Sequence, residues 1–279
     1  MSVSPSLIFL IGILIVTTGC SEQKPSPAEN EKQIGVQVYS VRNELSQNFD
    51  STLAELAKIG FDQIEAYGLR TDGTLYGMEP SAYKRAVEKY GMELVTTHSD
   101  YFTAEDAPQM IEAAREAGVE YVIIPYIPNE LRGDYDAIAQ NLNEIGVLFK
   151  EAGIGFGYHN HDFEFFPTED GRIPMEILIE GTDPDMVSFQ LDLYWVVKAG
   201  NDPMEIINKY PGRFISFHVK DSDRELNQTT VGTGIVDIKT VLGNQERAGY
   251  KFYFVEDERV DAPLMNLKAG HDYLRNLDF

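Results

Sequence analysis

Two histidines, His159 and His161, stand two residues apart in the segment GIGFGYHNHDFEFF. The apolar residues before them predict a buried β-strand, and side chains at positions i and i+2 of a strand share one face. Both imidazoles would therefore point the same way, with Glu164 on the loop that follows. Imidazole and carboxylate groups this close together can bind a metal ion or transfer protons. The structural alternative is a pair of histidines bonded to nearby backbone.

Apolar runs and amphipathic segments alternate along the chain from Ile34 onward. The apolar runs predict strands at residues 34–39, 61–67, 92–98, 119–125, 153–161, 186–192, 213–221 and 251–257. The amphipathic segments predict helices at residues 49–60, 80–91, 107–118, 135–153, 174–180, 203–210, 236–249 and 263–276. Eight such units predict a closed (β/α)8 TIM barrel, a single α/β domain over residues 34–279. A doubly wound open sheet is the alternative, although VYSVRNE after the first strand is no glycine-rich phosphate loop.

In such a barrel, the carboxyl ends of the strands meet at one rim, where catalytic groups collect. The polar side chains at or just past these ends are Gln37, Tyr39, Glu65, His98, Asp100, His159, His161, Asp192, His218 and Glu256. Four of the five histidines therefore converge on this rim. The fifth, His271, lies in the last predicted helix and is expected to be structural.

Histidine and carboxylate together form a mixed nitrogen and oxygen ligand set, which suits a borderline divalent ion rather than Ca²⁺. Mn²⁺ is the first choice, with Co²⁺, Fe²⁺, Zn²⁺ or Mg²⁺ as alternatives. Such an ion would hold vicinal oxygens of a sugar and acidify the C–H bond next to a carbonyl, which a neighbouring carboxylate or imidazole could deprotonate. Lys220 could stabilise the enolate oxygen, or be an ordinary surface lysine. Trp195 could stack on a sugar face or close the barrel mouth.

Five blocks of the sequence, in order, resemble the sugar phosphate isomerase/epimerase family of xylose isomerase-like TIM barrels. They are GYHNHDFEF, QLDLYWVVKAGNDP, RFISFHVKD, VGTGIVD and FVED. The resemblance implies a metal such as Mn²⁺ held by Glu, Asp, His and Glu at the ends of strands five to eight. Asp192, His218 and Glu256 match the last three of these positions. His159 stands where the first glutamate is usual and completes the expected ligand set.

The resemblance leaves two reactions open. In ketose epimerases the strand-five glutamate is one of two bases, so His159 puts two-base epimerisation in question unless Glu164 replaces it. The H-x-H pattern is more similar to the inosose dehydratase branch, which eliminates water with one base and one acid. Glu256 would be the base, with His98 or His161 as the acid and Lys220 beside them.

We therefore expect a metal-dependent sugar isomerase or epimerase that transfers a proton next to a carbonyl. A lyase or dehydratase acting on 3-keto-glycosides or keto-polyols is the close alternative, and a non-catalytic sugar-binding lipoprotein is a third. The expected substrate contacts are Gln37, Tyr39, Glu65, His98 and Trp195. The catalytic set is Glu256, His161, Lys220 and Glu164.

The charge of the chain narrows the choice of partner. With 23 basic and 45 acidic residues, the net charge is -22. Binding to a nucleic-acid backbone needs clustered Lys and Arg, so this composition argues against nucleic acid and against an abasic-site endonuclease. It suits a neutral or metal-bound small molecule, and it permits an oligomer.

The first residues differ from the rest. Residues 7–16, LIFLIGILIV, are too short an apolar run to span a bilayer and are typical of a signal peptide. The run leads to Cys20, the only cysteine, and resembles a bacterial lipoprotein signal in which that cysteine is lipidated. An ordinary secretory signal is the alternative. Residues 1–20 would be the signal and residues 21–33, polar and proline-containing, a flexible tether.

A lipid anchor implies the periplasm or outer membrane of a bacterium, with membrane contact only through that anchor. Sugar phosphates are rare outside the cytoplasm, and the predicted rim shows no arginine cluster to hold a phosphate. We therefore expect an unphosphorylated sugar, keto-sugar or glycoside as the substrate.

The lipoprotein prediction can be tested by Cys20→Ser. The variant should lose its membrane attachment, because the thiol that would carry the lipid is gone. Fractionation of cells into membrane and soluble parts measures this. A serine variant that still sediments with membranes would contradict the prediction.

Overall fold

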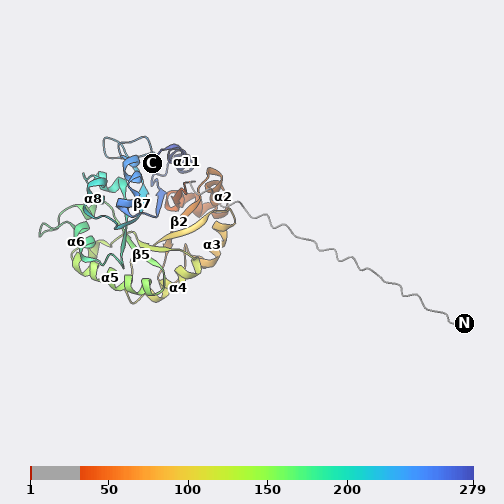
Figure 1. Cartoon of the computed structure of the whole chain (residues 1–279), viewed down its shortest axis with the longest axis horizontal. Helices are drawn as coiled ribbons and strands as arrows, with labels where there is room; N and C mark the ends of the chain where they lie inside the picture. The colour runs from red at the N-terminus through yellow and green to blue at the C-terminus, as the bar shows by residue number, and fades with distance from the viewer. Residues whose placement is uncertain (2–31) are drawn as a thin grey trace. The chain divides into compact units, whose positions relative to one another are not determined.

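A computed structural model describes Met1 and residues 32–279. The predicted signal peptide, Cys20 and nearly all of the tether therefore lie outside the described residues, and the lipid anchor stays a prediction. Among the helices that are described, none is long and apolar enough to cross a membrane. Residues 33–279 form one compact unit (Figure 1).

Eight parallel strands close into a barrel. They are β1 (Gly35–Gln37), β2 (Gln63–Leu69), β3 (Glu93–Ser99), β4 (Tyr121–Ile124), β5 (Gly155–His159), β6 (Ser188–Asp192), β7 (Phe214–Val219) and β10 (Phe252–Val255). Their order around the barrel is β1-β10-β7-β6-β5-β4-β3-β2. The parallel pairing of β1 with β10, Gly35 opposite Phe254, closes the ring. The predicted TIM barrel is confirmed, and this pairing excludes an open sheet.

Helices follow the strands and surround the barrel (Figure 1). The main ones are α2 (Phe49–Ile59), α3 (Pro80–Glu88), α4 (Ala107–Ala117), α5 (Tyr135–Glu151), α6 (Pro174–Gly181), α8 (Pro203–Lys209) and α11 (Pro263–Asn276). Their ends follow local rules. The side chain of Asn48 caps α2, and Gly60 ends it with a φ of 112°, a conformation that glycine adopts without steric cost.

Several short elements were not predicted. The 3-10 helix η1 (Val38–Val41) and helix α1 (Arg42–Gln47) follow β1, and helix α7 (Leu193–Lys198) follows β6 directly. The carboxylate of Asp192 accepts a hydrogen bond from the backbone N–H of Trp195. It therefore caps α7 at the residue where β6 ends.

Several predicted boundaries are wrong, and one predicted helix is divided. Strand β5 ends at His159, so His161 lies on the following loop. Strand β7 ends at Val219, and a small hairpin of β8 (Asp221–Ser222) and β9 (Gln228–Thr229) follows. The predicted helix over residues 236–249 is divided into α9 (Ile238–Gly243) and α10 (Gln245–Ala248). Asn244 lies between them in a non-helical conformation, with φ -105° and ψ 41°.

Helix α5 packs closely against the segment that leads into β6, and this close packing can be tested at Gly146. A Cβ atom at Gly146 would lie 2.7 Å from the carbonyl oxygen of Met186, which precedes β6. Gly146→Ala should therefore lower the free energy of unfolding by about 1–3 kcal/mol, although alanine normally stabilises a helix interior. Urea denaturation measures the change.

Gly243→Ala is the matched control. Apart from its chain neighbours and the backbone of its own helix, no described atom lies within 4 Å of the Cβ position at Gly243, which is exposed at the end of α9. This variant should be neutral or more stable by up to ~1 kcal/mol. Equal effects of the two substitutions would contradict the packing argument.

Candidate metal centre

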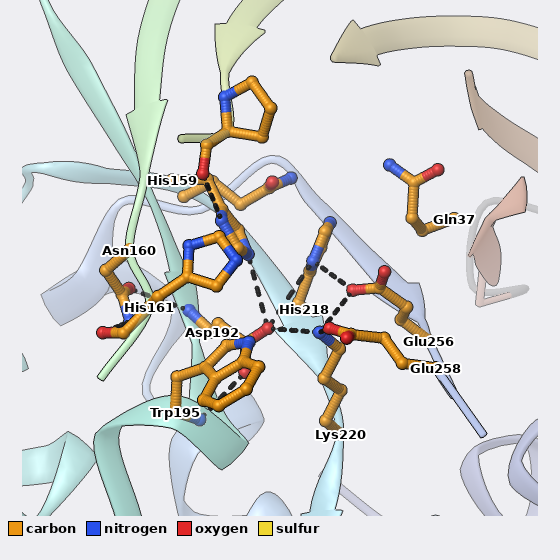
Figure 2. Close-up of polar contacts among 12 residues, drawn as sticks. Gln37, His159, Asn160, His161, Asp192, Trp195, His218, Lys220, Glu256 and Glu258 are labelled. Carbon is orange, nitrogen blue, oxygen red and sulfur yellow. Dashed lines mark hydrogen bonds and ion pairs between the residues drawn. The ribbon is translucent and has the colours of Figure 1, made fainter. Parts of the chain in front are cut away.

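Four side chains from four strand ends converge at the carboxyl rim of the barrel. His159 and Asp192 are the last residues of β5 and β6, His218 lies on β7, and Glu256 directly follows β10. One ligand atom from each lies within 4.8 Å of those from the other three. We call His159, Asp192, His218 and Glu256 the four-residue group; Figure 2 shows them pointing toward one another.

The atoms of this group fit a divalent cation. His159 Nε2 lies 3.3 Å from Asp192 Oδ2, and His218 Nδ1 lies 2.6 Å from Glu256 Oε2. His218 Nδ1 and Glu256 Oε2 are buried, and neither makes a hydrogen bond of good geometry. Buried lone pairs that converge in this way are costly unless a cation or proton donor satisfies them. Two imidazoles with two carboxylates suit a borderline divalent metal.

The second nitrogen of each imidazole has its own partner. His159 Nδ1 lies 3.3 Å from the carbonyl oxygen of Pro125. His218 Nε2 contacts the carboxylate of Glu65. Such outer contacts orient metal-binding histidines and select the ligating nitrogen. The nitrogens that remain for a metal are Nε2 of His159 and Nδ1 of His218.

Lys220 lies beside the four-residue group. Its side chain is 1% exposed, and Nζ lies 2.8 Å from both Asp192 Oδ2 and Glu256 Oε2. It also contacts Glu258 Oε1. Burial works against its charge, but Asp192, Glu256 and Glu258 raise the pKa of Lys220 well above its ordinary value. The alternative of a surface lysine is therefore wrong.

Glu258 was missed by the sequence analysis. It belongs to the same cavity wall as Glu256, two residues earlier in the chain. The spacing of two that drew attention to His159 and His161 could have found it.

A cavity of about 400 Å³ opens beside the four-residue group. Its size is in the range of small-molecule sites. The residues that line it are Tyr39, Tyr67, Gly68, His98, Ser99, Asp100, Pro125, Tyr126, His159, His161, Lys220, Glu256 and Glu258. Aromatic and hydroxyl-bearing side chains of this kind can contact both the faces and the hydroxyl groups of a sugar.

Two histidines of the cavity wall are held neutral. Burial lowers the pKa of His98 to about 4, and its Nε2 lies 2.7 Å from Gln190 Oε1. Burial also lowers the pKa of His161 well below its ordinary value. The His161 ring lies 5.3 Å from that of Trp195, and its Nδ1 is buried without a hydrogen-bond partner.

Gln37 and Glu65, expected to contact substrate, are fully buried and lie outside the cavity wall. Gln37 Nε2 donates a hydrogen bond of 2.9 Å to Glu65. Burial alone would raise the pKa of Glu65, but His98 and His218 bring it down to about 2. Trp195 is half-buried on α7, and Lys198 Nζ lies 4.3 Å from its ring centre.

Glu164 does not join the four-residue group. It accepts hydrogen bonds from the hydroxyl of Tyr158 and, over 2.9 Å, from the backbone N–H of His161. Burial raises its pKa to about 7. Its two oxygens therefore hold the turn that carries His161. The fifth histidine, His271, lies 3.0 Å from the Gly60 carbonyl oxygen, a structural contact as expected.

Several known proteins resemble this chain. An inosose dehydratase from Geobacillus thermodenitrificans is 24% identical over 260 residues, covering 78% of this chain and 84% of the relative. A sugar phosphate isomerase/epimerase structure from Parabacteroides distasonis is 28% identical with a TM-score of 0.78, covering 90% of this chain and 96% of that one. The IolI protein, solved with a bound zinc atom, is 13% identical with a TM-score of 0.64, over 88% and 98% of the two chains, and shows the fold alone.

The family model described as the xylose isomerase-like TIM barrel matches residues 53–277. This range includes all four residues of the four-residue group and seven of the eight barrel strands, β1 lying before it. The chain belongs to the xylose isomerase-like TIM barrel family of enzymes.

Proposed function

We propose that this protein is a divalent-metal-dependent enzyme that removes the proton next to the carbonyl of an unphosphorylated sugar or keto-sugar. The observation that carries the proposal is the four-residue group, of which His159 and Glu256 line a sugar-sized cavity. The relatives named inosose dehydratase and sugar phosphate isomerase/epimerase support a sugar-like substrate.

The first step is removal of the proton next to the carbonyl, and the residues of the site have different roles in it. A bound divalent cation supplies charge that polarises the substrate carbonyl and acidifies the neighbouring C–H bond. Glu256 can accept that proton because its carboxylate stays ionised: Lys220 and His218 hold its pKa well below the usual range in spite of burial. The Lys220 ammonium, next to Glu256, stabilises negative charge on the enolate oxygen.

Elimination is the outcome that the site supports best. Two-base epimerisation would use a second carboxylate from strand five, but His159 stands there and Glu164 is engaged by Tyr158 and His161. In elimination, Glu256 takes the proton from the α-carbon and the bond from the β-carbon to its oxygen breaks. A C=C bond forms, the proton that Glu256 took goes on to the departing oxygen, and His161, which burial keeps neutral, is placed in the same cavity to donate a hydrogen bond to that oxygen. We therefore place the lyase before the isomerase that the sequence alone favoured.

Isomerisation or epimerisation is the second candidate. It begins with the same proton removal and differs in that a proton returns to carbon. Glu256 can itself deliver that proton to the neighbouring carbon, which isomerises the sugar without a second carboxylate. The relationship to sugar phosphate isomerase/epimerase structures also favours this outcome.

The charge around the cavity favours an unphosphorylated substrate. Asp100, Glu256 and Glu258 line it, and Lys220, already paired with two of these three, is the cation among the lining residues. Carboxylates at this density repel a phosphate dianion.

Product analysis in D₂O separates the two reactions. Mn²⁺-loaded protein should convert a 3-keto-glycoside or a keto-polyol into an unsaturated ketone, with release of an alcohol or water. Mass spectrometry and NMR identify the products. A deuterium-labelled epimer would instead support the second candidate. Tight sugar binding without any exchange or product would contradict the enzymatic proposal and favour a sugar-binding protein.

Substitution of single residues of the four-residue group tests whether the group binds a metal. Asp192→Asn and Glu256→Gln should each weaken binding of Mn²⁺ by more than ~100-fold, because a direct ligand matters at least as much as its outer partners. Both variants should keep the far-ultraviolet circular dichroism of the wild type. Titration calorimetry measures the affinity.

Glu130→Gln is the control for this experiment, because Glu130 is exposed on the 3-10 helix η2 (Asn129–Leu131). It should bind metal like the wild type. Dialysis against a chelator should abolish activity, and added Mn²⁺ should restore it. A Glu256→Gln variant with unchanged metal affinity would contradict the proposed centre.

A further inference from the structure

Beneath the four-residue group, the barrel interior contains a buried carboxylate. Glu65 lies on β2 and is 0% exposed. Its Oε1 accepts hydrogen bonds from Thr96 Oγ1, at 2.8 Å, and Gln190 Nε2, at 2.9 Å. Its Oε2 accepts one from Gln37 Nε2, at 2.9 Å, and contacts His218 Nε2. The side chains of four different strands therefore meet at this one carboxylate.

Glu65, His98 and His218 lie close enough together to suggest a second cation site. The hydrogen bonds argue against that interpretation. Each oxygen of Glu65 already has at least two partners that donate, or can donate, a hydrogen bond to it. A cation would have to displace these contacts inside a closed barrel. Glu65 is instead suited to accept hydrogen bonds from its neighbours.

We propose that Glu65 is a positioning residue that acts on the metal through His218. By accepting a hydrogen bond from the Nε2–H of His218, it leaves Nδ1 of that ring to bind the metal beside Asp192 and Glu256. This inference rests on the proposed metal-dependent function. It assigns Glu65 a role different from the substrate contact expected from the sequence.

The argument depends on what a carboxylate can do. A neutral imidazole carries one N–H, and the partner of one nitrogen decides which nitrogen holds it. An ionised carboxylate only accepts hydrogen bonds, so Nε2 of His218, which faces Glu65, carries a proton, and a metal at Nδ1 takes the place of any proton there. Thr96, Gln37 and Gln190 hold Glu65 in place.

The other histidine of the four-residue group has the opposite arrangement. His159 Nδ1 faces the carbonyl oxygen of Pro125, and its Nε2 faces Asp192. The two rings should therefore bind one metal through different nitrogens: Nε2 of His159 and Nδ1 of His218. This asymmetry is a spectroscopic signature by which the arrangement can be checked.

Glu65→Gln tests the proposal. In the wild type, both oxygens of Glu65 accept hydrogen bonds. The glutamine amide has one acceptor oxygen, so its NH₂ group would face groups that themselves donate hydrogen bonds. Affinity for Zn²⁺ and Mn²⁺ should fall about 10- to 100-fold, the effect typical of losing an outer partner of a metal ligand. Titration calorimetry measures it, and circular dichroism checks the fold.

Thr96→Val is the matched control. It is close in shape and removes one hydrogen bond to Glu65, but it keeps the carboxylate against His218. Metal affinity should change much less than in Glu65→Gln. Equal losses in the two variants would show that disturbance of the buried layer, and not the carboxylate, is responsible, and would overturn the proposal.

NMR of ¹⁵N-labelled histidine in the Zn²⁺-loaded wild type provides a second readout. We expect His218 to bind through Nδ1 with a proton on Nε2, and this measurement stands even if Glu65→Gln fails to fold. A His218 bound through Nε2 would overturn the inference. If the wild-type protein bound neither Mn²⁺ nor Zn²⁺, that result would contradict the proposed function itself. If the wild type bound metal and Glu65→Gln bound it equally well, only the proposed role of Glu65 would be contradicted.

Discussion

Three buried carboxylates, those of Glu65, Asp192 and Glu256, lie at the centre of this barrel, and each needs a partner of opposite charge or a proton donor. His218 stands between Glu65 and Glu256, with one ring nitrogen toward each. Lys220 connects Asp192 to Glu256. Because removal of one member leaves another charge buried and unpaired, the site is constrained as a unit.

This constraint arranges the upper barrel as a series of layers. Glu65 and its donors form a buried polar layer, the four-residue group lies above it, and Lys220 and Glu258 line the cavity beyond. The charge balance depends on His159. With an imidazole in place of a carboxylate, the four-residue group carries two negative charges and not three. It also has one carboxylate fewer to act as a base, which is why the site suits one-base chemistry.

The sequence by itself determined the fold and the rim. Apolar runs, helix caps and terminal glycines are local signals, so eight strand–helix units could be counted without knowledge of any contact. A parallel barrel then has to bring its strand ends together. For that reason His159, Asp192, His218 and Glu256 could be predicted to meet from their positions alone. Short elements such as α7 were missed, since six residues are too few to show a helical period.

Only the tertiary structure decided which polar groups face the cavity and which face the protein. Glu65 was expected near a strand end, but β2 continues to Leu69 and its register against β3 shifts between Ile64 and Glu65. The side chain therefore lies deeper than the rim, under His218. Glu164 was expected in the catalytic set, yet it lies in the 3-10 turn Phe163–Phe165 and accepts a hydrogen bond from Tyr158. Strand length, register and turn geometry are set by packing between distant segments, and no local pattern in the sequence encodes them.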